Sequence, residues 1–199
     1  MTEPTRQKWD SRYAGARLDP DPPSRVLEDY AHLLPVGGDA LDLACGLGAN
    51  ALFLARHGLV VTAWDISGEA IARLQKAADG LSVRAEVRAE VRAEVRDVVA
   101  GPPPPDTFDV VVVGRFLERA LCPAIAATLR PGGLLYYQTF SRRQTGDHGP
   151  RNPAYRLEDN ELLRLFPDLR VRAYRDEATT GDTTRGLRDE ALLVAQRES

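Results

Sequence analysis

A predicted strand that runs directly into a glycine turn is the feature that most constrains what this chain can fold into. Residues 40–51 have the sequence Ala-Leu-Asp-Leu-Ala-Cys-Gly-Leu-Gly-Ala-Asn-Ala. We expect residues 39–44 to form a buried strand and residues 49–57 to form a helix, which Gly58 closes. Gly46 and Gly48 let the backbone turn tightly and approach a bound molecule closely. The pattern predicts a strand–turn–helix unit with a ligand site at the turn.

Strands and helices alternate along the rest of the chain. Further strands are predicted at residues 59–64, 108–113 and 134–140, and helices at residues 24–34, 67–79, 118–129 and 158–166. Residues 169–178 and 187–196 are expected to close the sheet as an antiparallel pair. This alternation predicts an α/β fold with a mainly parallel sheet and helices on both faces, and the 199 residues correspond to a single domain.

A near-perfect four-residue repeat, Val-Arg-Ala-Glu, occupies residues 83–96. In a helix the repeat would stack like charges four residues apart, whereas in a strand Val and Ala alternate cleanly with Arg and Glu. We therefore expect a strand, although it would be unusually long. Its charged face would pair antiparallel with a second copy, which predicts a homodimer. The alternative is a tandem expansion that only lengthens a solvated strand or loop.

Composition argues against several classes of protein. No apolar run approaches the roughly 20 residues of a membrane-spanning helix, and the first residues lack the apolar core of a signal peptide. Two cysteines and three scattered histidines provide neither a disulfide framework nor a metal site. The net charge of −3 argues against a large nucleic-acid surface. We therefore expect a cytoplasmic protein whose partner is a small molecule, with no metal and no membrane contact.

Acidic residues stand in or just after three successive predicted strands, as Asp42, Asp65 and Asp97. A carboxylate buried in a strand, as that of Asp42 would be, is costly unless a cationic or hydrogen-bonding ligand provides a partner. The end of the next strand, at Asp65, is where a carboxylate takes both hydroxyls of a ribose. A side chain at the position of Asp97 can meet an adenine ring. The three acids suit a ligand with an adenosine and a positive charge but no phosphates.

These stretches resemble the class I S-adenosylmethionine-dependent methyltransferases. The resemblance rests on residues 42–50, on Trp-Asp-Ile-Ser at 64–67, on Asp97 and on Leu-Arg-Pro-Gly-Gly at 129–133. Residues 42–51 and the early Trp-Asp-Ser-Arg-Tyr at 9–13 are most similar to the small tellurite-resistance (TehB-like) methyltransferases. The likeness covers residues 9–140 best. It implies a Rossmann-like sheet of seven strands in the order 3-2-1-4-5-7-6 with the last strand antiparallel, which would put the repeat at an edge.

The resemblance also implies a cofactor site for S-adenosylmethionine. Gly46 and Gly48 would pack against its methionine end, and Asp42 would act near its amino group, partly through water. Asp65 would bind the ribose, and Asp97 would bond the adenine amino group. The implied cofactor-binding residues are Trp9, Tyr13, Asp42, Ala44, Gly46, Gly48, Asn50, Asp65, Ile66 (which would pack on the adenine), Asp97 and Val98 (through its backbone).

The acceptor is expected beside the polar loop of residues 141–156, because a loop of this length in a compact domain is usually functional or disordered. The candidate catalytic residues are Arg115, His148 and Arg151, since arginine suits oxyanions and histidine titrates near neutral pH. The alternative for His148 is a solvated loop histidine. Residues 1–34 are expected to cap the site, with Trp9 and Tyr13 either over the cofactor or anchored in the core.

The resemblance predicts methyl transfer to a small-molecule acceptor: an oxyanion, a metalloid species, a thiol or a small metabolite. One alternative is a methyltransferase for RNA or protein. Another is a dinucleotide-dependent oxidoreductase that uses Gly46-x-Gly48-x-x-Ala51. A fourth possibility is a regulatory protein that binds the cofactor without turnover.

Overall fold

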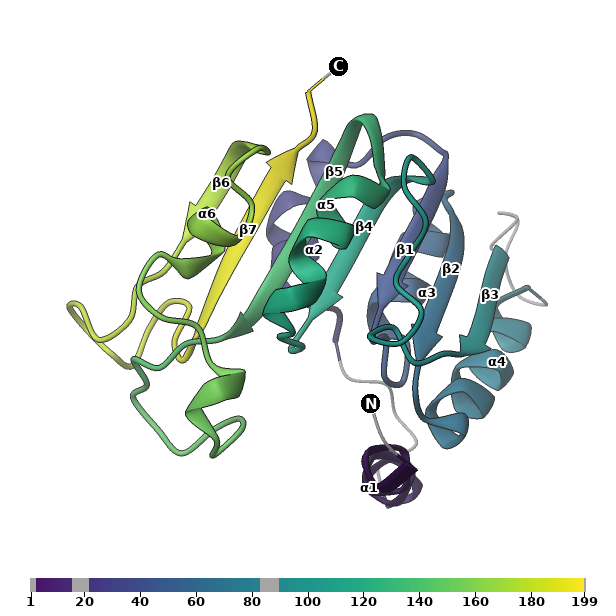
Figure 1. Ribbon diagram of the computed structural model, residues 1–199, viewed down its shortest axis with the longest axis horizontal. Helices are drawn as coiled ribbons and strands as arrows, with labels where there is room; N and C mark the ends of the chain where they lie inside the picture. Colours follow the sequence, from purple (N-terminus) through teal and green to yellow (C-terminus); the bar gives the residue numbers. More distant parts are fainter. Residues whose placement is uncertain (1–2, 16–21, 83–89, 199) are drawn as a thin grey trace.

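A sheet of seven strands forms the centre of the molecule in a computed structural model, which describes residues 3–15, 22–82 and 90–198 (Figure 1). The strand order is β3-β2-β1-β4-β5-β7-β6. Strands β1 to β5 pair in parallel, and β7 runs antiparallel to both β5 and β6. The strands are β1 Asp39–Leu43, β2 Val60–Asp65, β3 Glu90–Val95, β4 Phe108–Gly114, β5 Leu129–Phe140, β6 Arg170–Arg175 and β7 Glu190–Gln196. This topology confirms the expected fold class.

Helices cover both faces of the sheet, as the alternation of elements predicts. Along β4, Val110 and Val112 pack into the core under α2, α3 and α4, while Val111 and Val113 pack into the core under α5 and α6. All four valines are fully buried, which is why this strand is apolar at every position. The helices are α1 Glu3–Ala14, α2 Arg25–Tyr30, α3 Ala49–Arg56, α4 Gly68–Ser82, α5 Cys122–Thr128 and α6 Glu161–Leu165, with 3-10 turns η1 Ala31–Leu33, η2 Arg119–Leu121 and η3 Pro153–Tyr155.

Three expected elements differ from the structure. The repeat strand is observed as β3 at the sheet edge, over Glu90–Val95 only, and residues 83–89 lie outside the described residues. The helix expected over 118–129 divides into η2 and α5, and the chain is already extended from Leu129, where β5 begins. The N-terminal stretch, for which the sequence predicted no helix before residue 24, contains α1, a helix with no buried residue.

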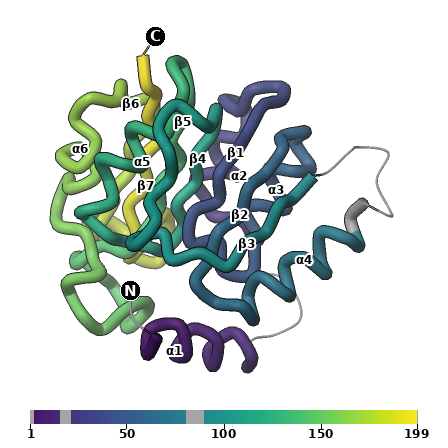
Figure 2. Tube along the Cα trace, turned by 45° about the vertical axis from the view of Figure 1, so that its right-hand side comes forward, coloured from purple at the N-terminus to yellow at the C-terminus, as the bar shows by residue number. Residues whose placement is uncertain are grey.

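The carboxyl ends of the parallel strands meet at one edge of the sheet, and α1 lies outside that edge (Figures 1 and 2). Ligands of open α/β sheets bind at this edge. Among the helices that the structure describes, none is long and apolar enough to cross a membrane.

Gly48 is predicted to be irreplaceable on steric grounds, because it packs the turn after β1 closely against α4. Its φ is 79°, and a Cβ atom added there would lie 2.2 Å from Cδ1 of Leu74. Gly48→Ala should lower the free energy of unfolding by about 2–4 kcal/mol, combining left-handed strain with overpacking.

The matched control is Gly80→Ala. Gly80 lies in α4, and an added Cβ there would meet no atom within 4 Å. This variant should be neutral or more stable by about 0.5–1 kcal/mol, since alanine is the better helix former. Equal stabilities of the two variants in urea unfolding would contradict the proposed packing role of Gly48.

Candidate active site

Asp42 is a fully buried carboxylate in β1, next to the glycine turn. Its Oδ2 accepts a hydrogen bond from the backbone N–H of Ala51 at 2.9 Å, and the nearby side chain of Asn50 acts to lower its pKa. Its Oδ1 is buried without any hydrogen-bond partner. Burial raises the pKa of Asp42 to about 7, and the neighbouring charge of Asp65 adds to the shift. An orphaned carboxylate oxygen of this kind needs a donor, which a bound ligand can provide.

Asp65 ends β2 and connects the glycine turn to the start of α4. Its Oδ2 accepts from the backbone N–H of Gly46, and its Oδ1 accepts from that of Ser67, each at 2.9 Å. The side chain is 5% exposed, and burial raises its pKa. Because a carboxylate oxygen accepts more than one hydrogen bond, both oxygens retain capacity for a pair of hydroxyl groups.

The turn between β1 and α3 is held in an unusual backbone conformation. Ala44, Gly46 and Gly48 have φ values of 57°, 53° and 79°, all in the left-handed region. At Ala44 this conformation is strained, because the residue has a side chain. A Cβ atom on Gly46 would lie 2.9 Å from the hydroxyl of Tyr13, so the turn has no room for a larger residue there.

Helix α1 is attached to this turn from outside the sheet (Figure 2). Asp10 accepts a hydrogen bond from Oγ of the buried Ser67 at 2.5 Å, and Arg73 donates to the carbonyl of Ala14 at 3.0 Å. Trp9 and Tyr13 stack with ring centroids 5.7 Å apart. Burial, reinforced by the charge of Asp65, raises the pKa of Tyr13. Both rings therefore lie outside the sheet core, and Tyr13 faces the glycine turn.

The residues expected at the adenine follow β2 and β3: Ile66 comes after β2, and Asp97 and Val98 come after β3. The carboxylate of Asp97 accepts from the backbone N–H groups of Val99 and Ala100 at 3.0 and 3.2 Å, which closes a local turn. The side chain of Val98 is 2% exposed and belongs to the core, so only its backbone is available to a ligand. Ile66 is half-buried between Asp65 and Ser67.

Arg115 follows the end of β4 and pairs with a buried acid that the sequence did not reveal. Its Nε donates to Oε1 of Glu190 at 2.9 Å. The other oxygen of Glu190 accepts from the side-chain amide of Gln138. Glu190 and Gln138 are 6% and 4% exposed. A single glutamate before the apolar run of residues 191–195 was the available signal for Glu190.

Phe140 brings two of the three candidate catalytic residues together. The guanidinium of Arg115 lies 6.0 Å from the centre of the Phe140 ring, and the His148 ring lies 5.8 Å from it. Arg151 is exposed, and the structure gives no contact that joins it to Arg115 or His148 within the described residues. Arg115 and His148 therefore both lie next to Phe140, and Arg151 lies apart from them.

The loop that carries His148 is organised around a buried guanidinium, Arg156. It is 5% exposed and donates to the carbonyls of Ser141 and Pro150 at 2.8 Å and of His148 at 2.5 Å. Sequence reasoning missed Arg156, because no local pattern distinguishes it from the surface arginines around it.

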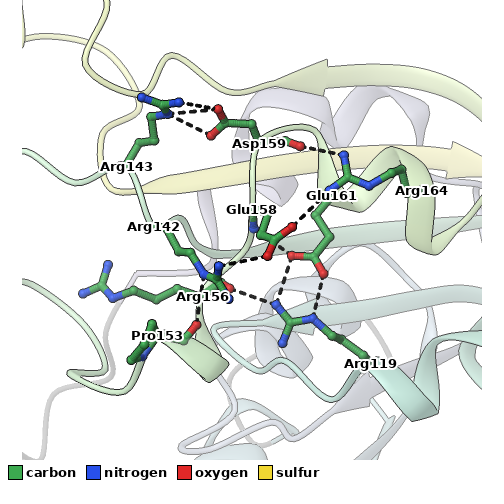
Figure 3. A network of polar contacts seen from close by, with 9 residues as sticks. All are labelled: Arg119, Arg142, Arg143, Pro153, Arg156, Glu158, Asp159, Glu161 and Arg164. Carbon is green, nitrogen blue, oxygen red and sulfur yellow. Dashed lines mark hydrogen bonds and ion pairs between the residues drawn. The ribbon is translucent and has the colours of Figure 1, made fainter.

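A second set of ion pairs fastens the same loop to the elements around it (Figure 3). Arg119 pairs with Glu161 at 2.6 Å and also donates to the carbonyls of Ala154 and Arg156. The loop pairs are Arg142 with Glu158 at 2.9 Å and Arg143 with Asp159 at 2.7 Å. The loop thus has a defined path beside the carboxyl end of β5.

Comparisons with known proteins agree with this geometry. Residues 40–133 match the family model of a methyltransferase domain. Over 141 residues the chain is 33% identical to a ubiquinone biosynthesis O-methyltransferase of Xanthomonas axonopodis pv. citri, covering 67% of this chain and 56% of that protein. The chain spans about half the length of the curated relatives it matches.

Two solved structures show the same fold at low sequence identity. TehB from Haemophilus influenzae superposes with a TM-score of 0.68 at 20% identity, covering 96% of this chain and 67% of TehB. The geranyl diphosphate C-methyltransferase from Streptomyces coelicolor, solved with Mg²⁺, geranyl diphosphate and S-adenosylhomocysteine, superposes with a TM-score of 0.66 at 17% identity, covering 87% and 80%. The matched domain, the similar O-methyltransferases and the strand order together show that the chain belongs to the class I S-adenosylmethionine-dependent methyltransferases.

Proposed function

We propose that this chain transfers a methyl group from S-adenosylmethionine to a small-molecule acceptor. The observation that carries the proposal is the buried, partnerless Oδ1 of Asp42 beside a glycine turn. A cationic ligand without phosphates suits this turn better than a dinucleotide does, because two buried acids, Asp42 and Asp65, lie where a phosphate would be repelled.

The cofactor roles follow from the hydrogen-bonding capacity of each residue. Asp42 would attract the amino group of the cofactor, and Asp65 would accept from the two ribose hydroxyls. Asp97 and Ile66 would line the adenine. Tyr13 would cover the methionine end, since its hydroxyl already lies against Gly46.

On the acceptor side, the residues mainly need to bind and orient a nucleophile. When bound, S-adenosylmethionine supplies a methyl group on a positively charged sulfur, which keeps the electron pair of the broken bond as a neutral thioether. Alignment accounts for most of the acceleration in such a displacement. Arg115 would orient the acceptor, and His148 would take a proton only from acceptors that are protonated before reaction. Arg151 is proposed only as a residue at the loop surface that approaches the acceptor.

The chemical class of the acceptor is the open part of the proposal. The curated relatives are named for O-methylation in ubiquinone biosynthesis, which supports a small acceptor. The net charge of −3 gives little support to RNA as the substrate.

Ligand binding distinguishes a methyltransferase from a dinucleotide-dependent enzyme. S-adenosylhomocysteine at a hundredfold excess over its dissociation constant should stabilise the folded chain by about 2.7 kcal/mol, a rise in Tm of roughly 5–10 °C for a chain of this size. NAD should give no shift. Asp65→Ala should abolish the shift, because the ribose loses its acceptor.

Asp79→Ala is the control, since Asp79 is an exposed carboxylate on α4. This variant should keep the shift. A shift with NAD alone would refute the proposed function, and an unchanged shift in Asp65→Ala would remove Asp65 from the cofactor site.

The ionisation of Asp42 should make cofactor binding depend on pH. Its pKa in the folded chain is raised to about 7, so the folded state without ligand loses stability as pH rises from about 4 through 7. A cationic ligand binds the ionised carboxylate of Asp42 more tightly than its protonated form. Its affinity, measured by calorimetry, should therefore increase by about tenfold per pH unit between roughly pH 5 and 7 and then level off.

The variant Asp42→Asn should flatten that profile and bind more weakly at every pH, because the amide carries no charge. Asp79→Asn should retain the wild-type profile. A wild-type affinity that is constant from pH 5 to 8 would show that Asp42 does not face the charged end of the ligand.

We also propose a homodimer through β3. An antiparallel pairing centred on Ala93 sets Arg92 opposite Glu94 of the second copy, and opposite charges at paired positions stabilise such a contact. Arg92, Glu94 and Val95 are exposed, Val95 at 53%. The edge position of β3 in the sheet supports this contact.

Light scattering tests the dimer. The wild type should have the mass of two chains, Arg92→Glu should shift the mass toward one chain, and the double variant Arg92→Glu/Glu94→Arg should restore two. A wild-type mass of one chain, or an unchanged mass in Arg92→Glu, would rule out this contact.

A further inference from the structure

The guanidinium of Arg115 is bound on one side only. Its Nε donates to Glu190, while its terminal nitrogens make no hydrogen bond within the described part of the chain. The side chain is 54% exposed, whereas that of Glu190 is 7% exposed. A buried carboxylate thus holds the inner edge of a half-exposed guanidinium and leaves its two terminal nitrogens available.

Glu190 has little freedom to move. One oxygen accepts from Arg115 and the other from the amide of Gln138, whose own oxygen accepts from the backbone N–H of Val26 at 2.8 Å. Removing one partner from a buried ion pair leaves an uncompensated charge, which is strongly unfavourable. The direction of the Arg115 side chain is therefore set from inside the protein.

The backbone of Arg115 is also fixed. Its φ is 53°, and its N–H donates to the carbonyl of Gln138 at 2.7 Å. A residue with a side chain remains in the left-handed region only where its surroundings enforce it, and such strain concentrates at functional sites.

The position of Arg115 places it beside the proposed cofactor site. Val113 pairs in register with Leu43, the last residue of β1, and Gly114 then ends β4. Arg115 is the next residue along, opposite the start of the glycine turn. Its side chain extends from there toward Glu190 on β7, so a group held by its terminal nitrogens would lie on the β5–β7 side of the proposed cofactor site.

We propose that Arg115 binds an anionic group of the methyl acceptor, a carboxylate or another small oxyanion, and that Glu190 and Gln138 are its positioning residues. The inference rests on the proposed function and narrows its acceptor class. A guanidinium presents parallel N–H groups that match the two oxygens of a carboxylate, which lysine cannot reproduce. With Nε committed to Glu190, the two terminal nitrogens form that fork.

The test uses two pairs of probes that differ only in charge. The pairs are 3-mercaptopropionate with its methyl ester and 3,4-dihydroxybenzoate with its methyl ester. Each is titrated by calorimetry into the full chain saturated with S-adenosylhomocysteine and assayed for methyl transfer with S-adenosylmethionine. In at least one pair the acid should bind about 10- to 100-fold more tightly than the ester, the range for charge-assisted hydrogen bonds.

Variants separate binding from mere structural support. Arg115→Gln should make the acid and the ester bind equally, and Arg115→Lys should restore only part of the preference. The control is Arg172→Gln, at an exposed arginine on β6, which should leave the affinities for the acid and the ester unchanged. Glu190→Gln should raise KM for the acid far more than it lowers kcat, and should have no further effect in the Arg115→Gln background. If Glu190→Gln lowers stability too far, Glu190→Asp keeps the charge and tests the same orientation.

The inference and the proposed function fail separately. Acids that bind no better than their esters, or an Arg115→Gln variant that loses both equally, overturn the inference. Methyl transfer to the esters would then still uphold the proposed function. Absence of S-adenosylhomocysteine binding overturns the proposed function itself. An additive effect of Glu190→Gln and Arg115→Gln overturns the positioning role of Glu190.

Discussion

The cost of keeping a carboxylate out of water organises this molecule. Asp42 is fully buried in β1, and one of its oxygens accepts from the N–H of Ala51 in the first turn of α3. That bond helps to fix where α3 starts, and the turn between β1 and α3 brings the chain around in the five residues 44–48. The second oxygen remains without a partner. A buried carboxylate oxygen without a partner lowers the stability of the fold. At the ligand-binding edge of the sheet, this cost is consistent with the proposed binding of a positively charged ligand.

Two backbone N–H groups near the start of α2 connect the cofactor and acceptor sides. Ser24 donates to the side chain of Asn50, which lies near Asp42. Val26 donates to Gln138, which in turn holds Glu190. The start of α2 is therefore held by one side-chain amide from α3 and one from β5, on the two sides of the proposed site. The apolar contacts of Val26 and Leu27 with the core make this attachment rigid.

The sequence predicted those features whose signals are local. Apolar strands such as β4, the glycine turn, and the acids Asp42 and Asp65 were identifiable because each sits within a short pattern with a physical meaning. Glu190 and Gln138 were not, because their roles arise from pairing across long stretches of chain, 75 residues between Arg115 and Glu190 and 52 between Gln138 and Glu190. Arg156 was missed although its partners are 6 to 15 residues away, because it binds main-chain carbonyls, which carry no residue-type signal. Helix α1 was missed for another reason: it buries no residue, so it has no apolar stripe.

Arg156 gives the loop beside the acceptor side an internal template. A single guanidinium gathers three backbone carbonyls there, much as a structural cation would, but without a dissociable ion. Because Arg156 binds main-chain oxygens, the side chains of His148 and Pro150 take no part in these bonds. Substitutions at such positions can therefore change the chemistry of the loop surface while the backbone keeps its path. Proteins with this fold can in this way come to bind different molecules.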